Sequence, residues 1–353
     1  MSLSPARAAA FDILRKVELG GYAGDLLLSA TAAFDTRDAG LASQIVFGCL
    51  RYQAQLDFLA AHFAGRERKL DREVRIALRM GIFQIRYLER IPRHAAVAES
   101  VALVKRARKT SAAGFVNAVL RKVTRDPVEW PSREVALSCP AWLLDRWSNR
   151  WGSEAAEGIA RAALVEPEKY SRGGRTQDIG AQSIVPLLGL APGHVFLDLC
   201  AAPGNKTAQA LESGVRAIAC DLHYHRIAQL RPLACDLLVI DGTQPLPFAR
   251  PFDRILVDAP CSGTGTLARN PEIKWRLSPA DLDDLALRQR RLLANARAAL
   301  AHGGVLVYST CSLEFEENQA VVADVPAELV VQNVERIPGR DPGDGFFAAV
   351  IRG

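Results

Sequence analysis

The sequence predicts an all-α bundle over about the first 125 residues and, further along the chain, an α/β domain built on a doubly wound, mainly parallel sheet. Up to Arg125, apolar residues recur at helical spacing, Gly and Pro are sparse, and no alternating strand pattern occurs. From Ile179 onwards, short apolar runs alternate with helical segments. Repeated strand–helix units of this kind are typical of doubly wound parallel sheets.

In the first part of the chain, each expected helix carries an apolar stripe. Ser4-Pro5 suits a helix start because serine caps helices and proline fits their first turn, and Gly20-Gly21 ends this helix. Further helices are expected at about Thr36–Tyr52, Leu56–Phe63, Arg72–Leu88, from Pro92 onwards, and at Ser111–Val123. Residues 126–176 are expected to form a connector with helices at about Pro140–Trp151 and Glu154–Leu164.

The α/β domain is expected over residues 177–353. The aliphatic run before Asp258 is typical of a strand that is buried on both faces. A long helix, at about Ser278–His302, should separate it from the next strand. The expected strands are Val195–Leu199, Val215–Cys220, Leu237–Ile240, Ile255–Asp258, Gly304–Ser309 and Phe346–Ile351, with the last of these at the edge of the sheet.

The composition is that of a soluble globular protein. Of the 353 residues, 49% are hydrophobic and 24% are charged. The sequence contains no run of about 18 apolar residues, so no membrane span is predicted. The first residues lack the apolar core of a secretory signal. The seven cysteines are scattered without paired zinc-ligand spacings. We therefore expect reduced thiols in a cytoplasmic protein, with no structural metal and no membrane partner.

Charge is distributed unevenly along the chain. Up to Arg125 there are 21 Lys and Arg against 11 Asp and Glu, whereas the remainder has 23 against 28. A basic part joined to a slightly acidic one indicates a polyanionic partner for the first part. A solvated basic helical surface would produce the same count.

Three of the expected strands end in an acid, namely Asp221, Asp241 and Asp258. The first strand runs into a small-residue loop, Cys200–Thr207 (CAAPGNKT). An acid about 20 residues past such a loop suits the hydroxyls of a ribose. The loop departs from the glycine pattern of nicotinamide cofactors, so S-adenosylmethionine is the predicted cofactor. Any one of these acids could instead cap the following helix, but three in register argue for a ligand site.

Two cysteines follow neighbouring expected strands. Cys261 lies just after the fourth strand and Cys311 just after the fifth. Because the carboxyl ends of parallel strands meet at one edge, both thiols should face the same cleft. A disulfide is the competing interpretation, and a cytoplasmic location disfavours it.

Several motifs resemble known families. The stretches 79–85 (RMGIFQI), 91–101 (IPRHAAVAESV) and 114–121 (GFVNAVLR) resemble the NusB RNA-binding fold. Together with the Cys200–Thr207 loop, the stretches 258–265 (DAPCSGTG) and 309–312 (STCS) are similar to the RsmB/NOP2/Sun family of RNA cytosine-5 methyltransferases. The resemblance implies a Rossmann-like class I methyltransferase domain behind a NusB-like domain at residues 1–125. It also implies an enzyme that uses S-adenosylmethionine to methylate carbon 5 of a cytosine in RNA, here 16S ribosomal RNA. We expect the protein to be a monomer.

The resemblance also implies a role for each site residue. Cys311 would be the nucleophile that adds to carbon 6 of the cytosine, Cys261 would assist release of the methylated RNA, and Asp258 would help the base to accept electron density. A cation such as Lys206 would stabilise the attacking thiolate. The implied cofactor contacts are Cys200, Ala201, Ala202, Pro203, Gly204, Asn205, Lys206, Asp221, Asp241 and Asp258.

The chain departs from the family pattern in two places. Asn205 replaces a glycine, and asparagine tolerates positive φ better than most residues. The small RNA-binding subdomain that the family carries before Gln177 is missing, because Tyr170 leads almost directly to that point. This trimming motivates an alternative hypothesis, an RNA-binding, antitermination-like module with an inactive methyltransferase half. A nicotinamide-dependent oxidoreductase is disfavoured by the loop sequence.

Overall fold

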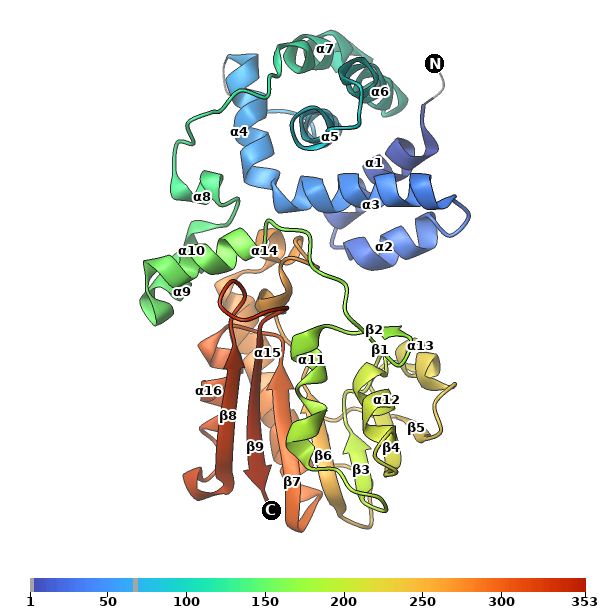
Figure 1. Ribbon diagram of the computed structural model, residues 1–353, viewed down its shortest axis with the longest axis vertical. Coiled ribbons are helices and arrows are strands. Elements are labelled where there is room, and N and C mark those ends of the chain that lie inside the picture. Colours follow the sequence, from blue (N-terminus) through green and yellow to red (C-terminus); the bar gives the residue numbers. More distant parts are fainter. Residues whose placement is uncertain (1–2, 66–68) are drawn as a thin grey trace. The chain divides into compact units, whose positions relative to one another are not determined.

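The computed structural model describes residues 3–65 and 69–353. The chain forms two compact units, drawn in Figure 1. Unit 1 contains Met1–Val165 and Ala268–Arg276, and unit 2 contains Glu166–Leu267 and Leu277–Gly353. The chain therefore contributes to unit 1 twice, the second time through a short segment that interrupts unit 2.

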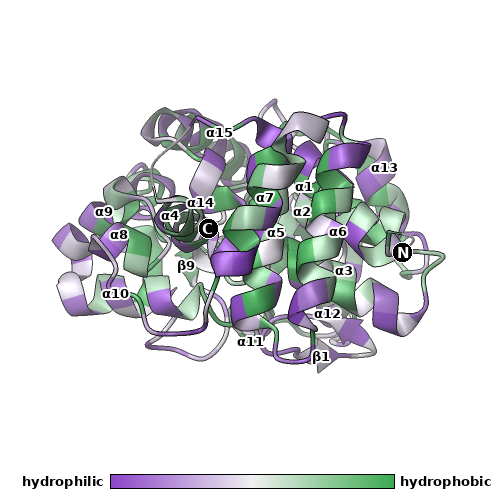
Figure 2. Cartoon of the chain, turned by 90° about the horizontal axis from the view of Figure 1, so that it is seen from above, coloured by the Kyte–Doolittle hydropathy of each residue, from purple (hydrophilic) through white to green (hydrophobic). Residues whose placement is uncertain are grey.

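Unit 1 is helical throughout the part that the structure describes. Helices α1 to α7 pack around one apolar core, and α5 is buried along most of its length, from Val74 to Ile85. Figure 2 shows hydrophobic and hydrophilic bands on α6 and α7, as expected for helices with one face in a core. The helices are α1 (Pro5–Val17), α2 (Ala23–Ala30), α3 (Thr36–Arg51), α4 (Gln53–Ala64), α5 (Arg72–Tyr87), α6 (Arg93–Arg106), α7 (Ala113–Lys122), α8 (Arg133–Ala136), α9 (Ala141–Trp151), α10 (Ser153–Ala162) and α14 (Ile273–Arg276).

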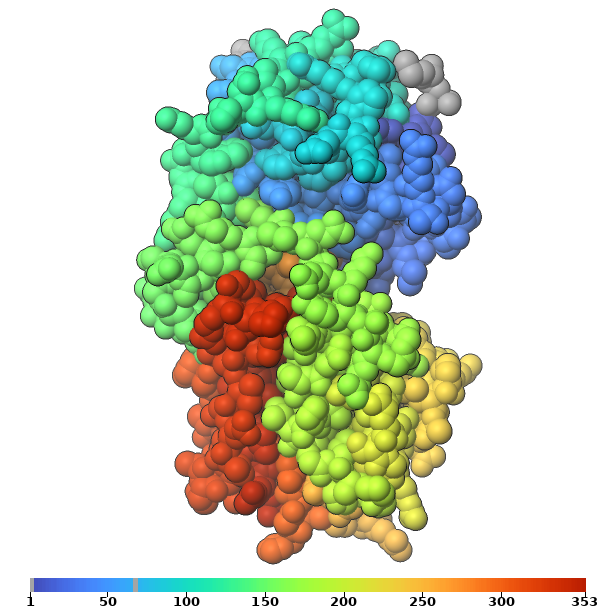
Figure 3. All heavy atoms as spheres, viewed as in Figure 1, coloured from blue at the N-terminus to red at the C-terminus, as the bar shows by residue number. Residues whose placement is uncertain are grey.

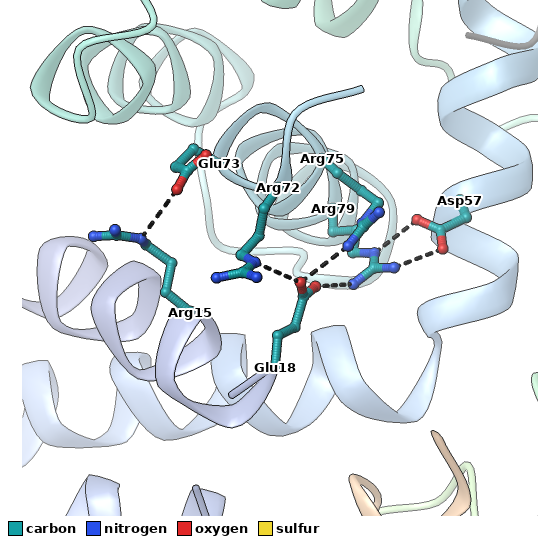
Figure 4. A network of polar contacts seen from close by, with 7 residues as sticks. All are labelled: Arg15, Glu18, Asp57, Arg72, Glu73, Arg75 and Arg79. Atoms are coloured by element: carbon teal, nitrogen blue, oxygen red, sulfur yellow. Dashed lines mark hydrogen bonds and ion pairs between the residues drawn. The ribbon is translucent and has the colours of Figure 1, made fainter. Parts of the chain in front are cut away.

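A network of charged side chains joins three helices of unit 1 (Figure 4). Arg79, on α5, donates from Nε and Nη2 to the two carboxylate oxygens of Asp57 at 2.6 and 2.7 Å. Its Nη1 donates to Glu18 at 3.0 Å, and Arg75 reaches the other oxygen of Glu18 at 2.9 Å. The Arg79 side chain is 8% exposed, whereas that of Arg75 is 40% exposed. Arg79 is therefore the buried centre of the network and Arg75 its solvated rim.

We expect Arg79→Met to lower the stability of unit 1 by about 3 kcal/mol, because it leaves two carboxylates without their buried partner. Arg75→Met removes a solvated contact to the same Glu18 and should cost less than about 1 kcal/mol. Hydrogen exchange of α5 peptides in the intact protein measures both losses. Equal losses in the two variants would contradict the assigned difference in burial.

The segment 268–276 provides partners for helix ends of unit 1. The Glu272 carboxylate accepts a hydrogen bond from the backbone N–H of Ala23, the first residue of α2, at 3.0 Å. Lys274 Nζ and Trp275 Nε1 donate to the last carbonyls of α3, those of Arg51 and Leu50, at 2.9 and 2.7 Å. An acid at a helix start and a cation at a helix end both match the helix dipole. Burial lowers the pKa of Lys274 to about 8.

Unit 2 is built on a seven-stranded sheet in the order β5-β4-β3-β6-β7-β9-β8. The five strands from β5 to β7 are parallel to one another. Strand β9 pairs antiparallel with both β7 and β8, so β8 runs in the same direction as β7. The strands are β3 (Val195–Asp198), β4 (Arg216–Asp221), β5 (Asp236–Val239), β6 (Phe252–Asp258), β7 (Leu300–Thr310), β8 (Val330–Arg336) and β9 (Phe346–Arg352), with a separate hairpin of β1 (Ser171–Arg172) and β2 (Arg175–Thr176). The chain leaves β3 for β4 on one side and returns to β6 on the other, so the sheet has its switch point between β3 and β6.

Helical segments cover both faces of this sheet. Leu197 and Ile255 point to the face that packs against Leu292 and Leu293 of α15 (Pro279–Ala298). Their neighbours Phe196 and Leu256 point to the opposite face, which Ile184, Val185 and Leu188 cover. In Figure 3 that covering segment, in green, lies beside the C-terminal strands, in red. The remaining short helices are α11 (Ile179–Gln182), α12 (Asn205–Leu211), α13 (Tyr224–Ile227) and α16 (Gln319–Val322).

The predicted fold class is confirmed, and one strand placement is wrong. The segment at 346–352 is not at the edge of the sheet, because β9 lies between β7 and β8. The strand at that edge is β8, which the sequence analysis missed because its side chains are exposed or half-buried and show no apolar run. The segment before β3 forms a short 3-10 helix, Val185–Leu188. Within the described residues, none of the helices has the length and apolar character that crossing a membrane requires.

Candidate active site

The loop after β3 brings backbone and small side chains to the switch point of the sheet. Ala201 N donates to Cys220 O at 2.8 Å, and Gly204 N donates to Ala201 O at 2.7 Å, which closes a tight turn through Ala202 and Pro203. Gly204 has φ +98°, and a Cβ there would lie 2.6 Å from Leu230 Cγ, so glycine is required. The next residue, Asn205, begins α12. The positive φ considered for Asn205 is therefore taken by Gly204 instead, and Asn205 donates its side-chain amide to Thr176 O.

A buried carboxylate lies beneath this loop. Asp198, the last residue of β3, is 1% exposed and accepts a hydrogen bond from Thr207 Oγ1 at 2.7 Å. Its other oxygen is buried and receives no well-formed hydrogen bond, although the Cys200 amide comes near it. Burial raises the pKa of Asp198 to about 7. The sequence analysis did not select Asp198, because this residue lies between the strand and the small-residue loop and no motif spacing marked it as a site residue.

An ion pair lies at the carboxyl end of β6. Lys206 Nζ donates to Asp258 Oδ2 at 2.6 Å, and Ser309 Oγ donates to Asp258 Oδ1 at 2.8 Å. Burial alone would lower the pKa of Lys206, but the charge of Asp258 and its hydrogen bond outweigh burial and raise it. The charge of Cys311 acts on Lys206 in the same direction. The pair is therefore charged and lies within electrostatic reach of that cysteine.

The two cysteines of the motifs meet. The Sγ atoms of Cys261 and Cys311 are 3.3 Å apart. Their strands pair in parallel with Asp258 opposite Ser309, so the loops after β6 and β7 begin at the same level. The hydrogen bond with Cys311 is the largest cause that raises the pKa of the Cys261 thiol, and burial adds to it. Cys261 is thus held as a neutral thiol against the sulfur of Cys311.

A close backbone approach keeps the two loops together. Gly265 N donates to Cys311 O at 2.9 Å, and Gly345 N donates to Gly265 O at 2.8 Å. A Cβ on Gly265 would lie 2.4 Å from Gly345 O, so no larger residue fits without moving the backbone. The loop that carries Cys261 is therefore in direct contact with the loop that carries Cys311.

Asp221 and Asp241, the other two acids expected at strand ends, accept hydrogen bonds from residues close to them in sequence. Asp221, at the end of β4, is 4% exposed and accepts a hydrogen bond from His223 N. Asp241, just after β5, is exposed and accepts hydrogen bonds from Thr243 N and Oγ1, which lower its pKa. The structure thus joins Asp258, Lys206 and the cysteines into one cluster, whereas Asp221 and Asp241 lie at the ends of the next strands along the same sheet edge. Across the described ranges, no group of His, Cys, Asp and Glu side chains is arranged to hold a metal ion.

Unit 2 is a doubly wound sheet that has a small-residue loop after β3 and acids along its carboxyl edge, and it is joined to a helical unit. This combination defines a Rossmann-like methyltransferase with a NusB-type domain. Sequence comparison agrees, because residues 185–329 match the 16S rRNA methyltransferase RsmB/F family and residues 4–125 match the NusB family. The chain belongs to the RsmB/F family of methyltransferases.

Curated relatives match over most of their length. The ribosomal RNA small subunit methyltransferase B of Thermus thermophilus is 36% identical, over 91% of this chain and 87% of its own. The probable enzyme of the same name from Bacillus subtilis is 30% identical, over 91% of this chain and 88% of its own. The crystal structure of PH0851 superposes with a TM-score of 0.79 over the whole of both chains at 20% identity, which supports the fold.

The cofactor of this class is S-adenosylmethionine, as predicted. The residues present fit it, because the ligand is a cation with a ribose diol and the sheet edge carries carboxylates. The buried Asp198 has one oxygen without a well-formed hydrogen bond, and the exposed Asp241 is an ionised acceptor. S-adenosylmethionine would be held by Asp198, Asp221, Asp241 and the loop 200–206. When bound, it supplies an electrophilic methyl group.

Proposed function

We propose that this protein methylates carbon 5 of a cytosine in 16S ribosomal RNA, in the cytoplasm, through a transient covalent bond to Cys311. The observation that carries the proposal is the 3.3 Å contact between Cys261 Sγ and Cys311 Sγ beside the Asp258–Lys206 pair. Curated relatives that match nearly the whole chain are named ribosomal RNA small subunit methyltransferase B, which supports this substrate.

In the proposed reaction, the Cys311 thiolate adds to carbon 6 of the base and makes carbon 5 nucleophilic. Lys206 stabilises the thiolate electrostatically, and Asp258 accepts a hydrogen bond from the amino group of the base. Carbon 5 then takes the methyl group. Water removes the carbon 5 proton, the double bond between carbons 5 and 6 re-forms, and the Cys311 sulfur leaves as a thiolate. The neutral Cys261 thiol donates a hydrogen bond to that departing sulfur, which assists release.

The test is to incubate the protein with 16S ribosomal RNA and methyl-labelled cofactor, then digest the RNA to nucleosides. We expect label in 5-methylcytidine. Label on adenosine, on another position of cytidine or on protein would contradict the proposal. If no label is transferred and calorimetry detects no heat with S-adenosylmethionine, the alternative of an RNA-binding module with an inactive methyltransferase half is favoured.

A further inference from the structure

Glu317 is a buried carboxylate for which the proposed reaction has no use. It ends the 3-10 helix Phe315–Glu317, is 0% exposed, and forms no ion pair within the part of the chain that the structure describes. A buried charge without a counter-ion is costly unless several hydrogen-bond donors satisfy it. The hydrogen-bond donors around Glu317 must therefore compensate the burial of its charge.

Those partners belong to the two loops that carry the cysteines. Glu317 Oε1 accepts hydrogen bonds from the backbone N–H of Ser262 at 2.8 Å and from Gln289 Nε2 at 2.9 Å. Glu317 Oε2 accepts from Ser262 Oγ at 2.5 Å and from Ser312 Oγ. Ser262 directly follows Cys261, and Ser312 directly follows Cys311. One carboxylate thus ties together the residues next to both thiols.

The surrounding contacts hold this carboxylate in place. Gln289 Nε2 also donates to Pro260 O at 2.9 Å, on the other side of Cys261. Tyr308 OH donates to the Glu317 backbone carbonyl at 2.6 Å. The hydroxyls of Ser262 and Ser312 are 3.0 Å apart. Since the hydrogen bonds of the carboxylate itself are buried, a shift of the carboxylate would move both loops.

We infer that Glu317 is a positioning residue that holds Cys261 and Cys311 at contact distance. Only the effect of Glu317 on methylation rests on the proposed function. Its negative charge is also one of the causes that keep the Cys261 thiol neutral, through a raised pKa. The sequence offered little signal, because Glu316 and Glu317 are adjacent acids and only the fold buries the second.

The test is Glu317→Gln, which keeps the side-chain size and removes the charge, with Glu328→Gln as the control. Glu328 is exposed, so the control makes the same change of net charge without touching the loops. Diamide converts the two thiols to a disulfide while its N=N bond takes up their two hydrogens, and the rate of this cross-linking reports the thiol contact without RNA. We expect Glu317→Gln to slow cross-linking by about tenfold and to lower kcat for methylation by about 100-fold, with KM for RNA nearly unchanged, because small misplacements cost this much.

A purely structural role would leave the acidity of Cys261 unchanged. Alkylation of Cys261 as a function of pH, followed by peptide mass spectrometry, should give a lower apparent pKa in Glu317→Gln than in the parent and the control. Unchanged cross-linking and unchanged alkylation in folded Glu317→Gln would overturn the inference. If that variant does not fold, Ser312→Ala removes one link and keeps the charge, so cross-linking alone should slow, and an unchanged rate would overturn the inference. If the thiol readouts shift but the parent protein methylates no RNA, the positioning role stands and the proposed function fails.

Discussion

Cys311→Ala will abolish methylation and form no covalent RNA adduct, whereas Cys261→Ala will accumulate one. Removing a nucleophile that acts with its neighbours as a unit costs roughly 10⁴-fold or more in rate. The two cysteines differ because Cys261 is held as a neutral donor, 3.3 Å from the sulfur that must depart. Without that S–H group, the departing Cys311 thiolate loses its stabilising hydrogen bond, and breakdown of the adduct slows more than its formation.

Denaturing gels with labelled RNA and cofactor will measure the adducts, and nucleoside analysis will measure the product. Cys235→Ala is the matched control, since Cys235 is a partly buried cysteine of unit 2 outside the thiol pair, and we expect full methylation. An adduct in Cys311→Ala and none in Cys261→Ala would show that the two roles are reversed. Normal product formation in Cys311→Ala would eliminate the covalent route altogether.

Asp198→Asn will make unit 2 more stable at neutral and higher pH and will weaken cofactor binding. Burial raises the pKa of Asp198 from its ordinary 3.8 to about 7. Below pH 4 the carboxyl is protonated in both the folded and the unfolded chain. Between pH 4 and 7 only the unfolded chain loses the proton, so the folded state loses stability as pH rises, by roughly 4 kcal/mol in total. Asparagine removes this loss and can still accept the hydrogen bond from Thr207.

Thermal unfolding of the intact protein from pH 4 to 8, with hydrogen exchange of β3 peptides to locate the effect, will test this prediction. Asp236→Asn on β5 is the control, because that acid is exposed and we expect no change in the pH profile. Calorimetry should show weaker binding of S-adenosylmethionine to Asp198→Asn, since a neutral amide attracts a cation less than a carboxylate does. Identical melting profiles for the parent and Asp198→Asn would contradict the assigned burial cost.

Local patterns in the sequence carried the fold class and the residues of the motifs. Helical spacing identified the bundle, and the alternation of aliphatic runs with helices identified the parallel sheet. The rule that ligands bind at the carboxyl ends of parallel strands then predicted that Cys261 and Cys311 would face one cleft, and the structure has them in contact. These inferences succeed because the pattern of apolar residues within a strand or helix depends on neighbours in sequence.

Only the tertiary structure decided which polar groups support these residues. Asp198, Gln289 and Glu317 come from different elements, and nothing in the local sequence marks them as buried partners. Strand β8 escaped detection because an exposed edge strand has little apolar pattern. Likewise, the pairing of Lys206 with Asp258 joins the start of α12 to the end of β6, two residues that are 52 positions apart in the sequence. Burial and hydrogen bonding between distant segments follow from packing, which depends on the whole sequence and not on any one stretch of it. The elements of this protein could therefore be predicted, whereas the network that holds its two thiols together could not.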